Sequence, residues 1–454
     1  MNSKTRPSRL AGTASVMGVL LAVIAPTVGA QDTPAPAAGA SSTAPPPRPP
    51  SAAGVFSPDP SPYYIGVSQG FTYDSNVYRI VGGPADAYSS TSLVGGFDQQ
   101  ISRQHVFGSA TVANNRYRDH SDLDYVSYGV TAGLDWETIN SLSGNVNASF
   151  NRNLAAPIST SGTGTPRQNI AETQSISARA RFGGSSLLAI EGSVGHGQID
   201  YSAPESAVSN STYDTGALTL FYTGGPLHLG VGPRGTRTRT PQALLDPTTG
   251  TYQGNTVTGQ NLDFFAGYAV TGLLSANTRL SYTKQTNSGV SSADFSGWTG
   301  GLSFAYHATG KIDVTVDVAR DAGFDSRFFN SFAVIQSGSS EVRIPITTLY
   351  ENNRVTDSFG LGATYAATAK IGVRAGARYS QAKISTLTVT TEVDQSVAES
   401  TDVIKMVYVG ADYAITRNVS AACNATYERR TVSGGVAFAY NTTTAGCSAQ
   451  LTWR

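Results

Sequence analysis

Charged side chains are scarce in this chain of 454 residues. Asp, Glu, Lys and Arg make up 14% of it, against about 25% in an ordinary globular protein. Acidic and basic residues are equal in number, 31 each, so no global field draws the chain to nucleic acid. Because 40% of the residues are apolar, the low charge does not indicate a disordered chain.

Signatures of catalysis and of metal binding are also missing. The five His, at positions 105, 120, 196, 228 and 307, fall into no metal-ligand or nucleophile spacing. A lipid-hydrolysing barrel would need a Ser/His pair at its lipid-facing rim, whereas His228 is predicted to point inward and His307 to lie in a turn. We therefore expect no enzyme, no metal and no cofactor.

Long apolar runs are missing as well, which excludes a transmembrane helix beyond the first thirty residues. Within those thirty, three basic residues precede the apolar run Val16–Ala25, and small residues follow up to Ala30. This order predicts a secretory signal peptide over residues 1–30, cleaved near Ala30. Residues 31–60, rich in Pro and Ala, are predicted to form a disordered periplasmic linker.

What the chain does have, over residues 61–454, is a repeated period-2 alternation. In Ile312–Ala319, Ile and Val alternate with Asp, Thr and Ala, and in Ile371–Ser380 apolar residues alternate with Gly, Arg and Ser. This period indicates strands with one apolar and one polar face. Short turns are predicted near residues 103, 139, 184, 224, 271, 309, 368 and 416. They join sixteen strands, and the segments Tyr63–Tyr73 and Thr444–Arg454 bring the number to eighteen.

The connections on the other side of these strands are predicted to be long loops, at residues 154–168, 202–211, 240–254, 325–352 and 383–400. Tyr268, Tyr306, Tyr365 and Tyr413 each end a strand at the short-turn side, as in an aromatic girdle. Short turns, long loops and a girdle are typical of outer-membrane proteins. We therefore predict an all-β fold, a transmembrane antiparallel up-and-down β-barrel of about 18 strands, in the outer membrane of a Gram-negative bacterium.

The charges indicate which face meets lipid. Lys or Arg on the lipid face at mid-membrane costs about 2–4 kcal/mol. Arg279 has the opposite parity to Leu280 and Tyr282, and all three Trp share the apolar parity near strand ends. A soluble sandwich would also alternate, but it would not place Tyr at the same end of successive strands. The apolar face is therefore predicted to meet lipid.

The other face should line a water-filled lumen, which an eighteen-strand barrel encloses unless it is plugged. Arg374 and Arg378 form a basic ladder on one strand, and Asp313 and Asp317 form an acidic ladder on another. Such side chains either contact a passing solute or polysaccharide, or pair with one another and fill space. The lumen candidates are Asp98, Arg179, Arg181, Glu191, Asp263, Arg279, Asp313, Asp317, Arg374 and Arg378. Facing acidic and basic rows, which uptake porins carry at a constriction, cannot be located in the sequence.

Two further features concern the second half of the chain. The segment Phe328–Tyr350 is long and partly apolar, and it forms either a constriction inside the lumen or an external hairpin turning at Ser337–Ser339. Cys423 and Cys447 lie on the last two strands with the lipid parity, so antiparallel pairing could bring them opposite each other. A disulfide is a possible outcome in an oxidising compartment.

The first strand carries a family resemblance. The stretch YYIGVSQGFTYDSNVYR, residues 63–79, ends an alternating strand in the polar corner Asp74–Asn76. With the repeated turns and the last strand, it resembles the β-barrel porin 2 family of outer-membrane barrels encoded with exopolysaccharide-biosynthesis operons. The resemblance covers Pro62–Arg454. One departure is that Trp453 is followed by Arg454, where outer-membrane barrels usually end in an aromatic.

The resemblance implies a pore for export of a surface exopolysaccharide, working with a periplasmic polysaccharide-export protein and inner-membrane machinery. Two alternatives stay open: a general or substrate-specific diffusion porin for small-solute uptake, and a structural or adhesive barrel. In each case the expected partners include outer-membrane lipid, lipopolysaccharide and the barrel assembly machinery. No nucleic acid is expected.

Overall fold

The computed structural model describes residues 61–139, 141–155, 168–183, 186–245, 252–271, 273–288, 294–322, 332–337, 340–345, 354–391, 394–433 and 439–453. The predicted signal peptide, residues 1–30, and the predicted linker, residues 31–60, lie outside the described residues. Among the described residues, no helix is long and apolar enough to cross a membrane.

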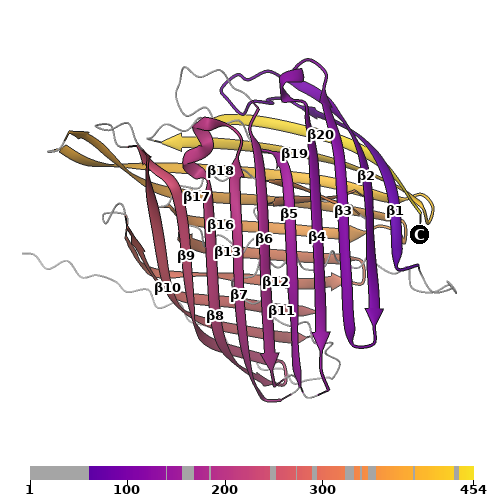
Figure 1. The fold of residues 1–454 in the computed structure, drawn as a ribbon. Helices are drawn as coiled ribbons and strands as arrows, with labels where there is room; N and C mark the ends of the chain where they lie inside the picture. The colour runs from indigo at the N-terminus through magenta and orange to yellow at the C-terminus, as the bar shows by residue number, and fades with distance from the viewer. Residues whose placement is uncertain are drawn as a thin grey trace, which may run out of the picture.

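Eighteen strands form one closed antiparallel sheet, as the sequence predicts (Figure 1). They are β1 (Tyr63–Asp74), β2 (Asp86–Ile101), β3 (Gln104–Tyr117), β4 (Tyr125–Glu137), β5 (Leu142–Leu154), β6 (Ile170–Phe182), β7 (Leu188–Tyr201), β8 (Ser211–Gly224), β9 (Leu227–Leu245), β10 (Tyr252–Thr271), β11 (Leu274–Asn287), β12 (Phe295–Thr309), β13 (Ile312–Ala322), β16 (Arg354–Ala366), β17 (Ile371–Thr391), β18 (Asp394–Ala414), β19 (Val419–Ser433) and β20 (Tyr440–Trp453). Each strand pairs with its neighbour in this order, which is the up-and-down topology.

The barrel closes where β1 pairs with β20, from Ile65 opposite Trp453 to Asp74 opposite Thr444. The C-terminus therefore lies beside the first strand (Figure 1). Closure leaves no sheet edge, so every strand finds hydrogen-bond partners on both sides. This is the condition that a sheet must meet to span a bilayer.

The outer face of the barrel is apolar. Large side chains of one parity are exposed along successive strands, for example Val407 and Val409 on β18. The girdle tyrosines lie next to the short turns, and each is 44–45% exposed: Tyr268, Tyr306, Tyr365 and Tyr413. Trp298 and Trp453 share the outer face. An exposed apolar belt of this extent is stable only in lipid, which supports the predicted orientation.

Each of the eight predicted short turns falls in, or within one residue of, the connection between the strands assigned to it, such as residues 102–103 between β2 and β3. Two of the predicted long loops are wrong. Residues 240–254 and 383–400 are mostly strand, because β9 and β10 reach Leu245 and Tyr252 and β17 and β18 reach Thr391 and Asp394. Alternating Thr and Val in the latter pair favour extended backbone beyond the membrane.

The prediction for His307 is also wrong. It lies in β12 rather than in a turn, opposite Asp313 of β13. The alternation of β12 continues to Thr309, and the connection to β13 is only two residues long. Sequence reasoning ended this strand too early, because the polar residues after Tyr306 resemble a turn although they are the last part of the strand.

The segment between β13 and β16 contains a separate hairpin. It consists of β14 (Phe332–Ser337) and β15 (Ser340–Pro345), which pair only with each other. This confirms that the segment forms a hairpin. The β14 strand lies near β18, β19 and β20, so the hairpin reaches sideways across several strands from its own place in the barrel.

The last two strands carry the two cysteines. Cys423 of β19 is directly opposite Cys447 of β20, with Cα atoms 4.0 Å apart. The structure joins them by a disulfide on the exposed, lipid-facing side of the sheet. The bond links the strand that closes the barrel to its sequence neighbour.

Candidate functional site: the inner wall

Polar and small residues line the inner wall of the barrel. On β10, for example, Leu262 and Phe264 are exposed outside, whereas Asp263 between them is 2% exposed. Inward-pointing side chains crowd together on the concave side of a curved sheet, which buries them. Every predicted lumen residue has this inward parity, by comparison with its exposed apolar neighbours.

The structure brings the two predicted ladders together. β13 pairs with β16 and β16 with β17, so Asp313, Thr364 and Arg374 are level with one another. Asp317, Gly360 and Arg378 form a second level. The acidic and the basic row therefore run side by side on the same wall, with one strand between them, about 10 Å apart at about 4.8 Å per strand. We call these four charged residues and the strand between them the charged trough.

The floor of the charged trough consists of small residues. A Cβ added to Gly362 would lie 2.8 Å from Thr315 Oγ1, and one added to Gly376 would lie 2.5 Å from Tyr408 Oη. At Gly360 the nearest atoms are those of Asp317, at 3.7–3.8 Å. Side chains from the neighbouring strands thus lie over the glycines, and larger residues there would push them away.

Parts of the charged trough are open to the lumen. Arg374 lies 3.7 Å from Asp412 of β18, and the two side chains are 21% and 46% exposed. Asp313 Oδ1 is hydrogen-bonded to Nδ1 of His307 at 2.5 Å, and the Asp313 side chain is 52% exposed. Charged groups with this exposure can contact a solute in the lumen.

Other predicted lumen residues are closed off. Asp263 accepts from Arg234 of β9 at 2.7 Å, and the two side chains are 2% and 1% exposed. Arg279 lies 3.5 Å from Asp321, with exposures of 3% and 7%. These groups point inward but are covered by their neighbours. The first pair joins the adjacent strands β9 and β10, and the second reaches from β11 across β12 to β13. Neither is well placed to touch a solute.

Three further predicted lumen residues lie on β6 and β7 and are partly covered by their neighbours. Arg179 is 4.0 Å from Glu191, which is buried. The guanidinium of Arg181 lies 5.2 Å from the ring centre of Phe221, at cation–π distance. The opposite-charge and aromatic contacts explain how three polar groups are accommodated on the wall of β6 and β7.

Asp98 is placed at the short-turn end of the lumen. His105 of β3 lies between two carboxylates there, with Nε2 2.7 Å from Asp98 and Nδ1 3.2 Å from Asp135. The Asp98 side chain is 62% exposed. This end of the wall is therefore acidic and accessible from the side of the short turns.

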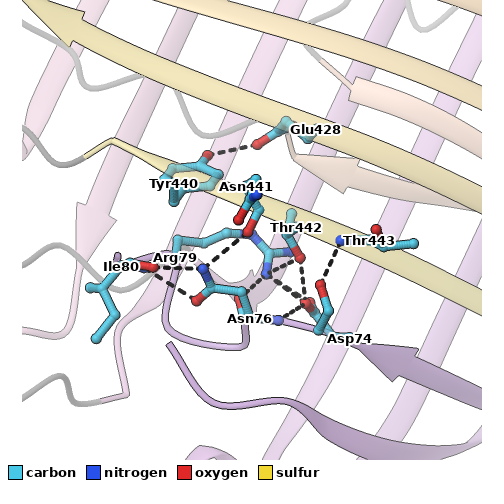
Figure 2. Close-up of polar contacts among 10 residues, drawn as sticks. Asp74, Asn76, Arg79, Ile80, Glu428, Tyr440, Asn441, Thr442 and Thr443 are labelled. Carbon is cyan, nitrogen blue, oxygen red and sulfur yellow. Dashed lines mark hydrogen bonds and ion pairs between the residues drawn. The ribbon is translucent and has the colours of Figure 1, made fainter. Parts of the chain in front are cut away.

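Sequence reasoning missed a buried polar cluster at the long-loop end of the seam, which is the pairing of β1 with β20 that closes the barrel (Figure 2). Asp74 of β1 accepts two hydrogen bonds from Arg79, at 2.9 and 2.8 Å, and one from Thr442 of β20 at 2.7 Å. Asn76 donates to the carbonyls of Ile80 at 2.6 Å and of Asn441 at 3.1 Å. We call this cluster the seam clasp. It ties the loop after the first strand to the last strand.

Arg79 adopts an unusual backbone conformation within the seam clasp. Its φ of 55° lies in the left-handed region, which is uncommon for a residue other than Gly. Burial lowers the pKa of Arg79, but the Asp74 carboxylate outweighs it and the net pKa is raised. A permanently charged Arg79 held on Asp74 stabilises this conformation. The family-like stretch therefore has a structural role that its sequence did not reveal.

Two further contacts tie neighbouring strands near this end. Arg430 of β19 donates to both carboxylate oxygens of Asp402 of β18, at 3.0 and 2.8 Å. Tyr440 of β20 donates to Glu428 at 2.6 Å. The partners are far apart in sequence, so only the strand register could have identified them.

The loop after β1 also touches the short 3₁₀ helix η1 (Ser121–Leu123) that precedes β4. Tyr78 donates to Asp122 at 2.9 Å. Burial and this hydrogen bond raise the pKa of Tyr78 to about 12. The phenol therefore remains a donor at any physiological pH, and the two loops stay joined.

No family model and no curated protein matches the chain. Solved structures do resemble it. OpdK of Pseudomonas aeruginosa with vanillate is 12% identical, covers 86% of this chain and 99% of its own, and gives a TM-score of 0.44. OccK2 (OpdF) of the same organism is 10% identical, with coverages of 86% and 98% and a TM-score of 0.45. The siderophore receptor PirA of Acinetobacter baumannii is 7% identical, with coverages of 87% and 81% and a TM-score of 0.41.

These likenesses concern the fold alone. What defines the class of this protein is its own geometry: a closed 18-strand antiparallel barrel, an exposed apolar belt and a polar inner wall. It is a β-barrel of the outer-membrane class. The resemblance to the β-barrel porin 2 family gains no support from the comparison with family models.

Proposed function

We propose that this barrel is a diffusion channel that passes small polar or charged solutes across the outer membrane. The observation that carries the proposal is the charged trough, in which an acidic row runs beside a basic row across one glycine-bearing strand. Neighbouring rows of opposite charge create a local field along the wall, which orients dipolar and zwitterionic solutes as they pass. Bidentate hydrogen bonds from arginines favour carboxylate or phosphate groups on such solutes.

This proposal differs from the export function that the sequence resemblance implies. Nothing in the comparisons supports exopolysaccharide export or a periplasmic export partner, and both remain predictions. The diffusion channel, the alternative open from the sequence, is the better supported function.

The test is ion selectivity in planar lipid bilayers. The wild-type chain is compared with Arg374→Gln/Arg378→Gln and with Asp313→Asn/Asp317→Asn. Removing the basic row should shift the reversal potential toward cation selectivity, and removing the acidic row should shift it toward anion selectivity. Arg116→Gln, which changes an arginine 64% exposed on the outer face and paired with Asp124, is the matched control and should leave selectivity unchanged.

Two results would contradict the proposal. One is a closed wild-type channel that conducts neither ions nor small solutes. The other is conductance with a selectivity that neither double variant alters. In either case the export hypothesis is tested next, by deleting the gene and measuring surface and periplasmic polysaccharide separately.

A further inference from the structure

A patch of positive charge lies on the outer face of the barrel, away from the lumen. Lys383 of β17, Lys405 of β18 and Arg429 of β19 all have the outward parity and are exposed. Lys405 is directly opposite Arg429, and on its other side it is opposite Tyr379. We call these three cations the basic patch. It occupies three adjacent strands.

The basic patch has no acidic partner among the residues that the structure describes. Other outward arginines near the same end of the barrel do: Arg152 lies 3.0 Å from Glu172, and Arg320 lies 3.3 Å from Asp357. Like charges directly opposite each other on adjacent strands destabilise a sheet. The Lys405–Arg429 pair therefore carries a cost that a bound anion would remove.

The height of the basic patch indicates where this anion lies. From Tyr413, at the short-turn girdle, to Lys405, β18 covers about 26 Å at about 3.3 Å per residue. With the usual strand tilt of about 40°, this is about 20 Å across the membrane, close to the apolar belt height of about 25 Å. Between them the outward side chains are apolar, including Val407 at 50% and Val409 at 51% exposed. Lys405 thus lies at the upper edge of the apolar belt, where lipid headgroups begin.

The side chains suit a phosphate group. An arginine offers a planar pair of donors to phosphate oxygens, and a lysine adds a point charge. The Lys405 ammonium lies 6.0 Å from the ring centre of Tyr379, which keeps it against the wall. Below it, Val407 and Val409 offer a surface for acyl chains. Headgroup and tails of one lipid molecule would therefore meet complementary surfaces.

We propose that the basic patch is a binding site for a phosphorylated lipid of the outer leaflet, with its phosphate between Lys405 and Arg429. Lys383, higher on β17, binds a second anionic group of the same headgroup. This site does not depend on the proposed channel function, because it lies on the opposite face of the sheet from the charged trough.

The experiment uses the full chain, purified in mild detergent and titrated with lipopolysaccharide while lipid-bound species are counted by native mass spectrometry. The wild type should retain the phosphorylated lipid and bind its enzymatically dephosphorylated form much more weakly. Lys405→Gln/Arg429→Gln should weaken binding about 10-fold to 30-fold, from the usual contribution of two cations near an anionic surface. Arg320→Gln, on the same face but paired with Asp357, should bind as the wild type does.

Three outcomes would overturn the proposal. The double variant binds phosphorylated lipid as tightly as the wild type, or the wild type does not distinguish phosphorylated from dephosphorylated lipid, or inorganic phosphate alone displaces the lipid completely. The last result would identify a soluble-anion site. If the double variant does not fold, as judged by heat-dependent electrophoretic mobility, the comparison of the two lipids on the wild type still decides the question.

Discussion

Two arginines of this barrel with equal exposure contribute in different ways, because the exposure of their carboxylate partners differs. Arg374 is 21% exposed beside a carboxylate that is 46% exposed, so a solute can reach the pair. Arg79 has the same 21% exposure, but it makes two hydrogen bonds to Asp74, which is 10% exposed and also accepts from Thr442. The first pair is suited to solute contact, and the second is suited to holding a loop.

At the residue scale we predict the effect of Arg79→Gln. The substitution leaves the Asp74 carboxylate without its cation inside the seam clasp, and it keeps a residue in left-handed backbone without the contact that held it. The free energy of unfolding should fall by about 2 kcal/mol, less than for a fully buried pair. Urea unfolding, followed by tryptophan fluorescence, measures it.

The control is Arg116→Gln, since the Arg116 side chain is 64% exposed in its pair with Asp124. An exposed pair of this kind contributes about 0–1 kcal/mol, so the control should change stability little. Equal losses in the two variants would show that the seam clasp has no special role.

Two strands of the chain, β14 and β15, take no part in the closed barrel sheet. β13 pairs directly with β16, and β14 and β15 pair only with each other. The hairpin is therefore an insertion on the long-loop side, although it lies near β18, β19 and β20. A constriction inside the lumen was one of the two forms predicted for this segment, and removing the hairpin tests it.

At the element scale we predict that replacing residues 332–345 by a short Gly/Ser linker leaves the barrel intact. All eighteen barrel pairings remain possible, so heat-dependent electrophoretic mobility and strand content by circular dichroism should match the wild type. A rise in single-channel conductance would show that the hairpin narrows the pore. Loss of the folded band would instead show that closure depends on the hairpin contacts.

Closure of the whole molecule depends on its first and last strands. β1 pairs with β2 on one side and with β20 on the other, and the disulfide joins β20 to β19. Without β20, the facing edges of β1 and β19 would expose unpaired backbone groups to lipid. Each such group costs several kcal/mol in hydrocarbon.

At the scale of the whole molecule we predict that deleting residues 440–454 abolishes assembly. Deleting residues 31–60, which the sequence places outside the barrel, should not. Membrane fractionation and heat-dependent mobility of the two variants measure this. Failure of the linker deletion to assemble would contradict the predicted domain boundaries, and assembly without β20 would contradict the closure described here.

The sequence was sufficient for the parity of the strands, for the short turns and for the number of strands. Period-2 alternation of Val and Asp in residues 312–319 is a local property, since each side chain alternates whatever the strand pairs with. The hairpin in this chain was recognised as one of two alternatives from its turn residues at Ser337–Ser339, which are also a local signal. The ends of β9 and β17 were placed too early and the starts of β10 and β18 too late, because polar alternation outside the membrane resembles a loop.

The inner wall depends on which strands are neighbours. Asp313 and Arg374 were both assigned to the lumen, but their alignment across Thr364 follows from β13 pairing with β16 beyond an intervening hairpin. Likewise, nothing local relates Asp402 to Arg430, or Arg79 to Thr442 of the last strand. Sequence alone thus determined an outer-membrane barrel with an apolar outside and a polar inside. Only the tertiary structure decided which charges face each other, because cross-strand register is a long-range property set by closure of the whole sheet.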